Sequence, residues 1–156
     1  MSSVAPLAAT GGQIAMAPAV SGPEKLATFR ITGFGAKDNT PPGSTTISMP
    51  VIHKQAGGTG TFTDPLTAAT PGHAGNGTEN PKGTKFYIPS IQRYVIIEDS
   101  GASKFSQPHL DIWSGTTSNV ETCESKITKT EQIIENPGPN HPVKAGPIAT
   151  ENGCNI

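Results

Sequence analysis

The chain has 156 residues, of which 15% are charged, and its formal net charge is −1 at pH 7. This composition argues against nucleic acid and against an anionic membrane surface as partners, because no basic stripe is present to neutralise phosphates. Glycine contributes 18 residues and proline 15, which favours many turns and short strands over long helices. No apolar run approaches the roughly 18 residues of a membrane span.

Residues 1–24 are rich in alanine, glycine, proline and serine. This composition predicts a loose arm or pro-segment without a core of its own. The stretch lacks the basic region and the continuous apolar core of a signal peptide, so we expect a mature or pro-form start that carries an added Met1. The remaining residues, 25–156, have the length of one domain.

Apolar and polar residues alternate over 27–34, where Phe29 and Ile31 share one face, and this pattern predicts a half-buried strand. A second short strand is expected over 47–52. The intervening segments are a turn cluster at 38–43, a glycine-rich loop at 57–60 and a short mixed stretch at 62–70.

The second half of the chain contains four further patterned segments after a long polar loop at 71–83. That loop holds the glycosylation sequon Asn76-Gly77-Thr78 and has a length that is often functional in compact domains. The β-branched and aromatic content predicts strands at 85–89, 93–98, 109–113 and 127–134. We expect the first two to form a hairpin, and for 127–134 we prefer a strand to a short helix. About six short strands with long loops indicate an all-β protein, a small closed barrel whose closure removes exposed strand edges.

Asp111 lies in the middle of the segment HLDIW, between Leu110 and Ile112. With a period of two, its side chain shares a face with His109 and Trp113. A buried carboxylate is costly unless it is paired or hydrogen-bonded, so a core face is rarely built from these three side chains. These three side chains instead suit a sugar-binding cleft, where an aromatic ring stacks on a pyranose and a carboxyl group hydrogen-bonds hydroxyl groups or moves a proton.

Two further aspartates have an alternative structural interpretation. Asp99 precedes Ser100-Gly101, and Asp64 precedes Pro65, and both contexts are typical of turns. Each of these two aspartates can therefore be interpreted either as a turn residue or as a member of a site with Asp111.

Four segments in order, TFTDPLTAAT, GTKFYIP, RYVIIEDSGA and HLDIW, resemble the three-aspartate (3D) domain of the double-psi β-barrel superfamily. That superfamily includes rare lipoprotein A-like proteins, expansins, small inverting endoglucanases and lytic transglycosylases. Asp64, Asp99 and Asp111 match the three aspartates of the pattern. The context is similar to small secreted proteins of fungi and actinobacteria. The chain departs from the bacterial pattern in a longer loop over 67–81 and in a missing glycine within 102–108, which leaves the substrate open.

The resemblance implies a small six-stranded double-psi β-barrel and a secreted, monomeric enzyme that cleaves a polysaccharide or cell-wall glycan. Asp111 would be the general acid, and Asp64 or Asp99 would hold a water for inverting hydrolysis or orient Asp111 in a lytic transglycosylase. Tyr87, Tyr94 and Trp113 are candidate stacking rings, with His109 beside them, although both tyrosines also fit barrel packing. The alternative function is a non-catalytic glycan-binding or inhibitor module of the expansin-like kind.

Cysteine occurs twice, at Cys123 and Cys154. A disulfide that ties the C-terminal tail to the body is the natural expectation for a secreted protein. The four histidines show no metal-ligand spacing, so we expect neither a metal nor another cofactor.

Overall fold

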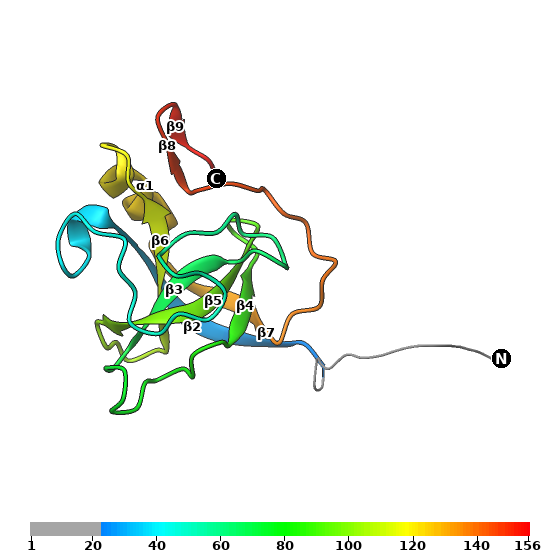
Figure 1. Ribbon diagram of the computed structural model, residues 1–156. Coiled ribbons are helices and arrows are strands. Elements are labelled where there is room, and N and C mark those ends of the chain that lie inside the picture. Colours follow the sequence, from blue (N-terminus) through cyan, green and yellow to red (C-terminus); the bar gives the residue numbers. More distant parts are fainter. Residues whose placement is uncertain (1–22) are drawn as a thin grey trace.

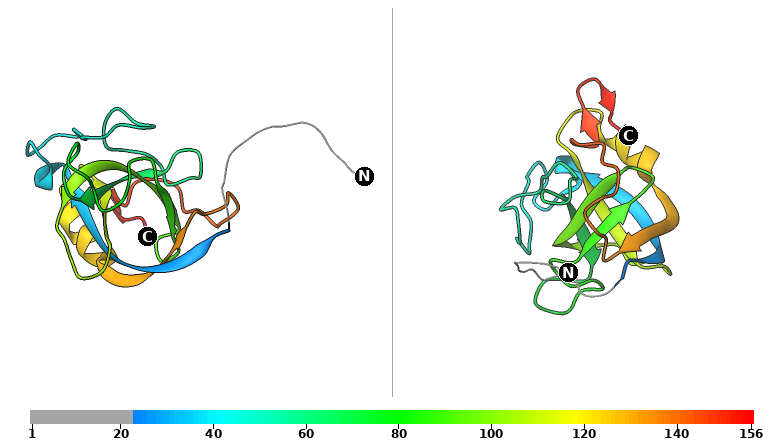
Figure 2. Two further views of the ribbon diagram at one scale, coloured as in Figure 1. Left: turned by 90° about the horizontal axis from the view of Figure 1, so that it is seen from below. Right: turned by 90° about the vertical axis from the view of Figure 1, so that its right-hand side faces the viewer.

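Six strands form one closed barrel in the computed structural model, which describes residues 23–156 (Figure 1). The strands are β2 (Lys25–Gly35), β3 (Leu66–Pro71), β4 (Lys85–Ile88), β5 (Arg93–Ala102), β6 (His109–Gly115) and β7 (Lys129–Glu135). Their order around the barrel is β2-β6-β3-β5-β4-β7, and β7 pairs with β2 to close the ring (Figure 2, left). The predicted all-β, six-stranded barrel is confirmed. The predicted N-terminal arm lies outside the described residues, apart from Pro23 and Glu24.

Two of the six strand pairs are parallel, β2 with β6 and β3 with β5, and the other four are antiparallel. A parallel pair requires a long crossover connection, which explains why long loops separate such short strands. The register of β3 against β5 shifts between Ala68 and Ala69, so that Glu98 becomes an extra, bulged residue of β5. Whether the crossovers form the two psi motifs of the resembled superfamily stays a prediction.

The barrel interior is filled by alternate residues of the strands. Phe29 and Ile31 of β2 and Leu110 and Ile112 of β6 are at most 2% exposed and belong to one apolar cluster. Because successive side chains of a strand point to opposite faces, this register leaves Asp111 on the outer face.

Two features of the fold differ from the sequence-based expectation. Residues 47–52 form irregular chain rather than a strand, and Ile47 and Met49 are buried from that loop. A helix, α1 (Val120–Ile127), precedes β7 where no helix was expected. Only Val120, Cys123 and Ile127 are buried in it, so its apolar stripe is too short to give a clear helical period. A 3₁₀ turn, η2 (Ala36–Asp38), follows β2.

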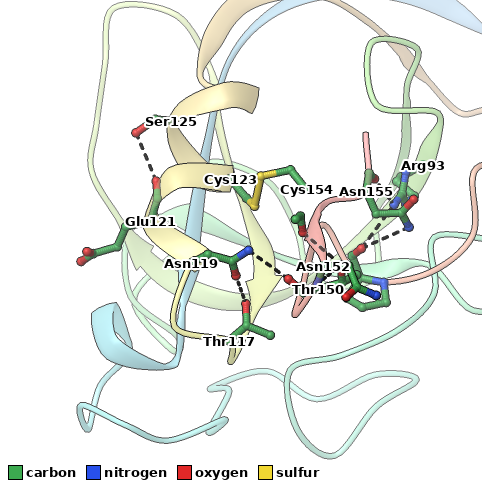
Figure 3. The surroundings of a disulfide bond; sticks show 12 residues. Arg93, Thr117, Asn119, Glu121, Cys123, Ser125, Thr150, Asn152, Cys154 and Asn155 are labelled. Atoms are coloured by element: carbon green, nitrogen blue, oxygen red, sulfur yellow. Dashed lines mark hydrogen bonds between the residues drawn. A yellow bond between two sulfur atoms is a disulfide. The ribbon is translucent and has the colours of Figure 1, made fainter.

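The C-terminal tail is fixed to the body by the predicted disulfide, which is confirmed between Cys123 of α1 and Cys154 (Figure 3). Cys154 belongs to a small hairpin of β8 (Ala149–Thr150) and β9 (Gly153–Cys154). Beside it, the fully buried Arg93 donates to the carbonyl oxygen of Asn155 at 2.7 Å. Burial lowers the pKa of Arg93 to about 10, so its side chain remains charged and holds the tail at neutral pH.

Further upstream, the tail covers the outer face of β4 and β5. The ring of His141 stacks on Tyr87 with centroids 4.6 Å apart, and the hydroxyl groups of Tyr87 and Tyr94 donate to carbonyl oxygens of Pro142 and Gly138.

Among the described residues, no helix is both long and apolar enough to cross a membrane.

Candidate functional site

A surface cavity of about 560 Å³ lies over the outer face of the barrel where β2, β6, β3 and β5 are neighbours. Three carboxylates line it: Asp111 from β6, Asp99 from β5 and Asp38 from η2. Uncharged polar side chains and a histidine complete the rim, namely Asn39, Thr40, Thr46, Ser48, His73 and Ser100.

The strand register sets the spacing of two of these carboxylates. Ala69 of β3 pairs with Asp111 on one side and with Asp99 on the other. Neighbouring strands lie about 4.8 Å apart, so the Cα atoms of the two aspartates are roughly 10 Å apart. Because Ala69 has only a methyl group, the space between them stays open and lies within the cavity.

Asp111 is half-buried at the base of this cavity. Its Oδ1 lies 2.8 Å from the hydroxyl group of Thr32, which also lies 2.6 Å from Nε2 of His109. Burial raises the pKa of Asp111 to about 6, and the nearby charges of Asp38 and Asp99 act in the same direction. The predicted shared face of His109 and Asp111 is therefore present, with Thr32 as the link between them.

Asp99 lines the cavity and also anchors a loop. Its Oδ1 accepts hydrogen bonds from the backbone N–H and hydroxyl group of Ser48, at 3.0 and 3.1 Å, and from the backbone N–H of Ser100 at 2.9 Å. No hydrogen bond joins Oδ2 to another residue of the described part of the chain. One oxygen of Asp99 is thus structural, and the other is available to a ligand.

Asp64 does not line this cavity, so the expected gathering of all three aspartates in one groove is not met. Its Oδ1 lies 2.6 Å from Nε2 of His53, whose Nδ1 lies 2.8 Å from Oε2 of Glu98. Glu98 is fully buried, and its other oxygen accepts the backbone N–H groups of residues 51–53. The loop that carries Asp64 folds back onto this histidine instead of reaching the cavity.

Charge balance stabilises the His53–Glu98–Asp64 cluster. Burial alone would lower the pKa of His53, but the hydrogen bonds and charges of Asp64 and Glu98 together raise it. Burial alone would raise the pKa of Glu98, but the backbone and imidazole donors together lower it. The hydrogen bond from His53 lowers the pKa of Asp64. Ionised carboxylates only accept, so hydrogen bonds to both of them need hydrogen on both ring nitrogens of His53, and the imidazole then holds residues 51–64 against the barrel.

The predicted stacking rings are not exposed. Tyr87 is 3% and Tyr94 0% exposed, because the tail covers both, as barrel packing predicts. Trp113 is 5% exposed and packs edge-on against Phe34, with ring centroids 5.3 Å apart. Phe34 lines the acidic cavity, whereas Trp113 lines a different cavity of about 350 Å³. His109 is 2% exposed and reaches the acidic cavity only through Thr32.

Sequence reasoning missed two acidic residues near Asp111, of which Asp38 lines the cavity and Glu124 does not. Asp38 was assigned only to a turn, and Glu124 lies on the unexpected helix α1. Glu124 packs over Gly33, where an added Cβ would lie 3.0 Å from its Cγ. The pKa of Glu124 is raised to about 8, mainly by burial and further by the nearby Asp38. No sequence signal marks Glu124, because the helix itself was not expected.

Within residues 23–156, no group of three or more His, Cys, Asp or Glu side chains is arranged to hold a metal ion.

The fold and the cavity define a small, disulfide-bonded β-barrel protein with an acidic site on its outer face. Residues 26–155 match the family described as DDB_G0273701 N-terminal domain, and the chain belongs to this family. A relative from Dictyostelium discoideum, named Uncharacterized protein DDB_G0273701/DDB_G0273221, is 32% identical over 123 residues. The match covers 72% of this chain and 52% of the relative, so the chain spans about half the length of that protein. No solved structure matches the chain.

Proposed function

We propose that the protein is a secreted polysaccharide-cleaving enzyme in which Asp111 protonates the glycosidic oxygen. The observation that carries this proposal is that Asp111 shares an open cavity with a second carboxylate, Asp99. A general acid works best when its pKa lies near the operating pH. The pKa of Asp111, raised to about 6 by burial, meets that condition for a mildly acidic environment.

The second carboxylate supplies the base in an inverting hydrolysis. Such enzymes keep their two carboxyl groups about 6.5–9.5 Å apart, so that a water fits between substrate and base. A Cα separation of roughly 10 Å across Ala69 is compatible with that range. The free oxygen of Asp99, or the carboxylate of Asp38, would orient the water. In a lytic reaction, Asp111 alone would serve as acid and then base.

The compartment and the substrate class belong to the same proposal. A disulfide is compatible with an oxidising, extracellular environment. Neutral polar groups around a few carboxylates suit a hydroxyl-rich ligand, and we propose a cell-wall glycan such as peptidoglycan, a cellulose-like glucan or chitin. The proposed enzyme acts as a monomer and needs no cofactor.

The alternative is a non-catalytic glycan-binding or inhibitor module. It is favoured by the three hydrogen bonds that commit one oxygen of Asp99 to loop anchoring. It is disfavoured by Asp111, which receives a side-chain hydroxyl contact and no backbone N–H bond within the described structure.

The test incubates the protein with insoluble peptidoglycan, glucan and chitin and measures soluble oligosaccharides. We expect release by the wild type and a loss of at least 100-fold in Asp111→Asn, the usual size of a general-acid effect. Glu151→Gln is the matched control, because Glu151 is exposed and does not line the cavity. Equal release by wild type and Asp111→Asn would contradict the role of Asp111. Binding to a polymer without release would support the alternative module.

A further inference from the structure

A chain of short hydrogen bonds connects the carboxyl group of Asp111 with the buried imidazole of His109. The Oγ1 atom of Thr32 lies 2.8 Å from Oδ1 of Asp111 and 2.6 Å from Nε2 of His109. The other ring nitrogen, Nδ1, lies 2.6 Å from the carbonyl oxygen of Ser103. Thr32 pairs with Asp111 in the parallel register of β2 and β6, which places its hydroxyl group between two side chains of one face of β6.

The count of hydrogens in this chain restricts the protonation states of its members. A carbonyl oxygen only accepts, so Nδ1 of His109 carries the hydrogen that bonds Ser103. In a neutral imidazole, Nε2 then only accepts. An ionised Asp111 also only accepts, and the single hydroxyl hydrogen of Thr32 can serve just one of the two. Every contact is satisfied only when the chain holds one further proton, on Asp111 or on His109.

The surroundings favour Asp111 as the holder of that proton. Burial lowers the pKa of His109, and the charge of Arg30 adds to this effect, while the carbonyl of Ser103 and the carboxylate of Glu79 oppose it. Burial raises the pKa of Asp111, and Asp38 and Asp99 act in the same direction, whereas a hydrogen bond from Thr32 to the ionised carboxylate opposes them.

We propose that His109 is a positioning residue that keeps Asp111 protonated, as the proposed general-acid role of Asp111 requires. The neutral ring accepts the hydroxyl hydrogen of Thr32, which turns the lone pairs of Oγ1 toward Asp111. A protonated Asp111 then donates to Thr32, whereas an ionised Asp111 competes with Nε2 for one hydrogen. His109 thus acts on the chemistry through Thr32, without touching a substrate.

The first test observes the His109 ring by long-range ¹H–¹⁵N NMR of the full chain, from about pH 4.5 to 8, where Asp111 titrates. We expect the tautomer with hydrogen on Nδ1, and an Nε2 signal that shifts with the same midpoint as the Asp111 carboxyl signal. Thr32→Val removes the link and abolishes this shared titration, while Thr32→Ser keeps the hydroxyl group and preserves it. Near-UV circular dichroism verifies that each variant is folded.

The second test replaces His109 with leucine, which frees the hydroxyl hydrogen of Thr32 for Asp111. The titration midpoint of Asp111, measured by ¹³C NMR, is then expected to fall. An unchanged or higher midpoint in the folded variant overturns the proposal. So does a His109 ring protonated on both nitrogens over this pH range, or a shared titration that persists in Thr32→Val. These measurements need no substrate, so they are independent of whether any glycan is cleaved.

Discussion

Replacing Asp111 with asparagine is predicted to change how the stability of the protein depends on pH. Asparagine has the same shape and can still hydrogen-bond Thr32 through its amide group, but it does not titrate. In the wild type, the pKa of Asp111 is raised from 3.8 to about 6 by burial. The folded state therefore holds this proton more tightly than the unfolded state, so ionisation of Asp111 destabilises the fold.

The size of this effect follows from the two pKa values. The difference between 3.8 and about 6 corresponds to about 3 kcal/mol of unfolding free energy, since one pKa unit is 1.36 kcal/mol. Stability from the protonated group is present at low pH, begins to fall as the pH passes 3.8, and is fully lost above about 6. Between about pH 4.5 and 7.5, the wild type is therefore expected to lose about 2 kcal/mol relative to Asp111→Asn.

The assay is urea denaturation of the wild type, Asp111→Asn and the exposed-surface control Glu151→Gln at both pH values. All other titrating groups are common to the wild type and Asp111→Asn, so a pH-dependent difference between these two proteins arises from Asp111 and its effect on neighbouring groups. A difference in unfolding free energy that does not change with pH, or that changes in the opposite direction, would refute the assignment of a buried, proton-binding Asp111. The control is expected to follow the wild type.

Three further predictions concern the parts of the fold that support the site. Replacing Cys123 and Cys154 with serine opens a loop of 31 residues and is expected to cost about 3–4 kcal/mol in unfolding free energy, measured by urea denaturation without reductant. His53→Gln removes an imidazole whose pKa is raised in the folded state. Its contribution to stability is full below pH 6.5 and is lost as the pH rises through the raised pKa. The variant is therefore expected to be more destabilised, relative to the wild type, at about pH 6 than at about pH 9. The added methyl group of Gly33→Ala would meet atoms of the neighbouring strand and helix at 2.7 and 3.0 Å, so a drop of about 1–3 kcal/mol is expected, and a neutral result in thermal denaturation would argue against that close packing.

Strands with one face in the barrel and one face outside were predictable from alternation. β6 shows why: Leu110 and Ile112 point inward and are 0% exposed, while Asp111 between them points outward. β3 has no such pattern. All six of its residues, Leu66–Pro71, are buried, because loops cover its outer face, and the strand has no alternation to detect.

The candidate site was predictable only in part, for a physical reason. Asp111 was found from the cost of placing a carboxyl group within an apolar strand. Thr32 and Asp38 lie far from Asp111 in the sequence, and Glu124 lies on the unexpected helix, so only barrel closure and the docking of α1 bring these side chains to Asp111. Asp64 fits the resembled motif equally well, yet its partner is His53, which no spacing rule in the sequence connects with it.

A ¹³C NMR titration of the Asp111 carboxyl group, assigned by its loss in Asp111→Asn, tests most directly whether the cavity holds a proton donor. We expect a midpoint at about 6, set by burial and by the neighbouring carboxylates. A midpoint at the ordinary value of 3.8 would show a carboxylate that is already ionised at the working pH, and it would contradict the proposed general acid.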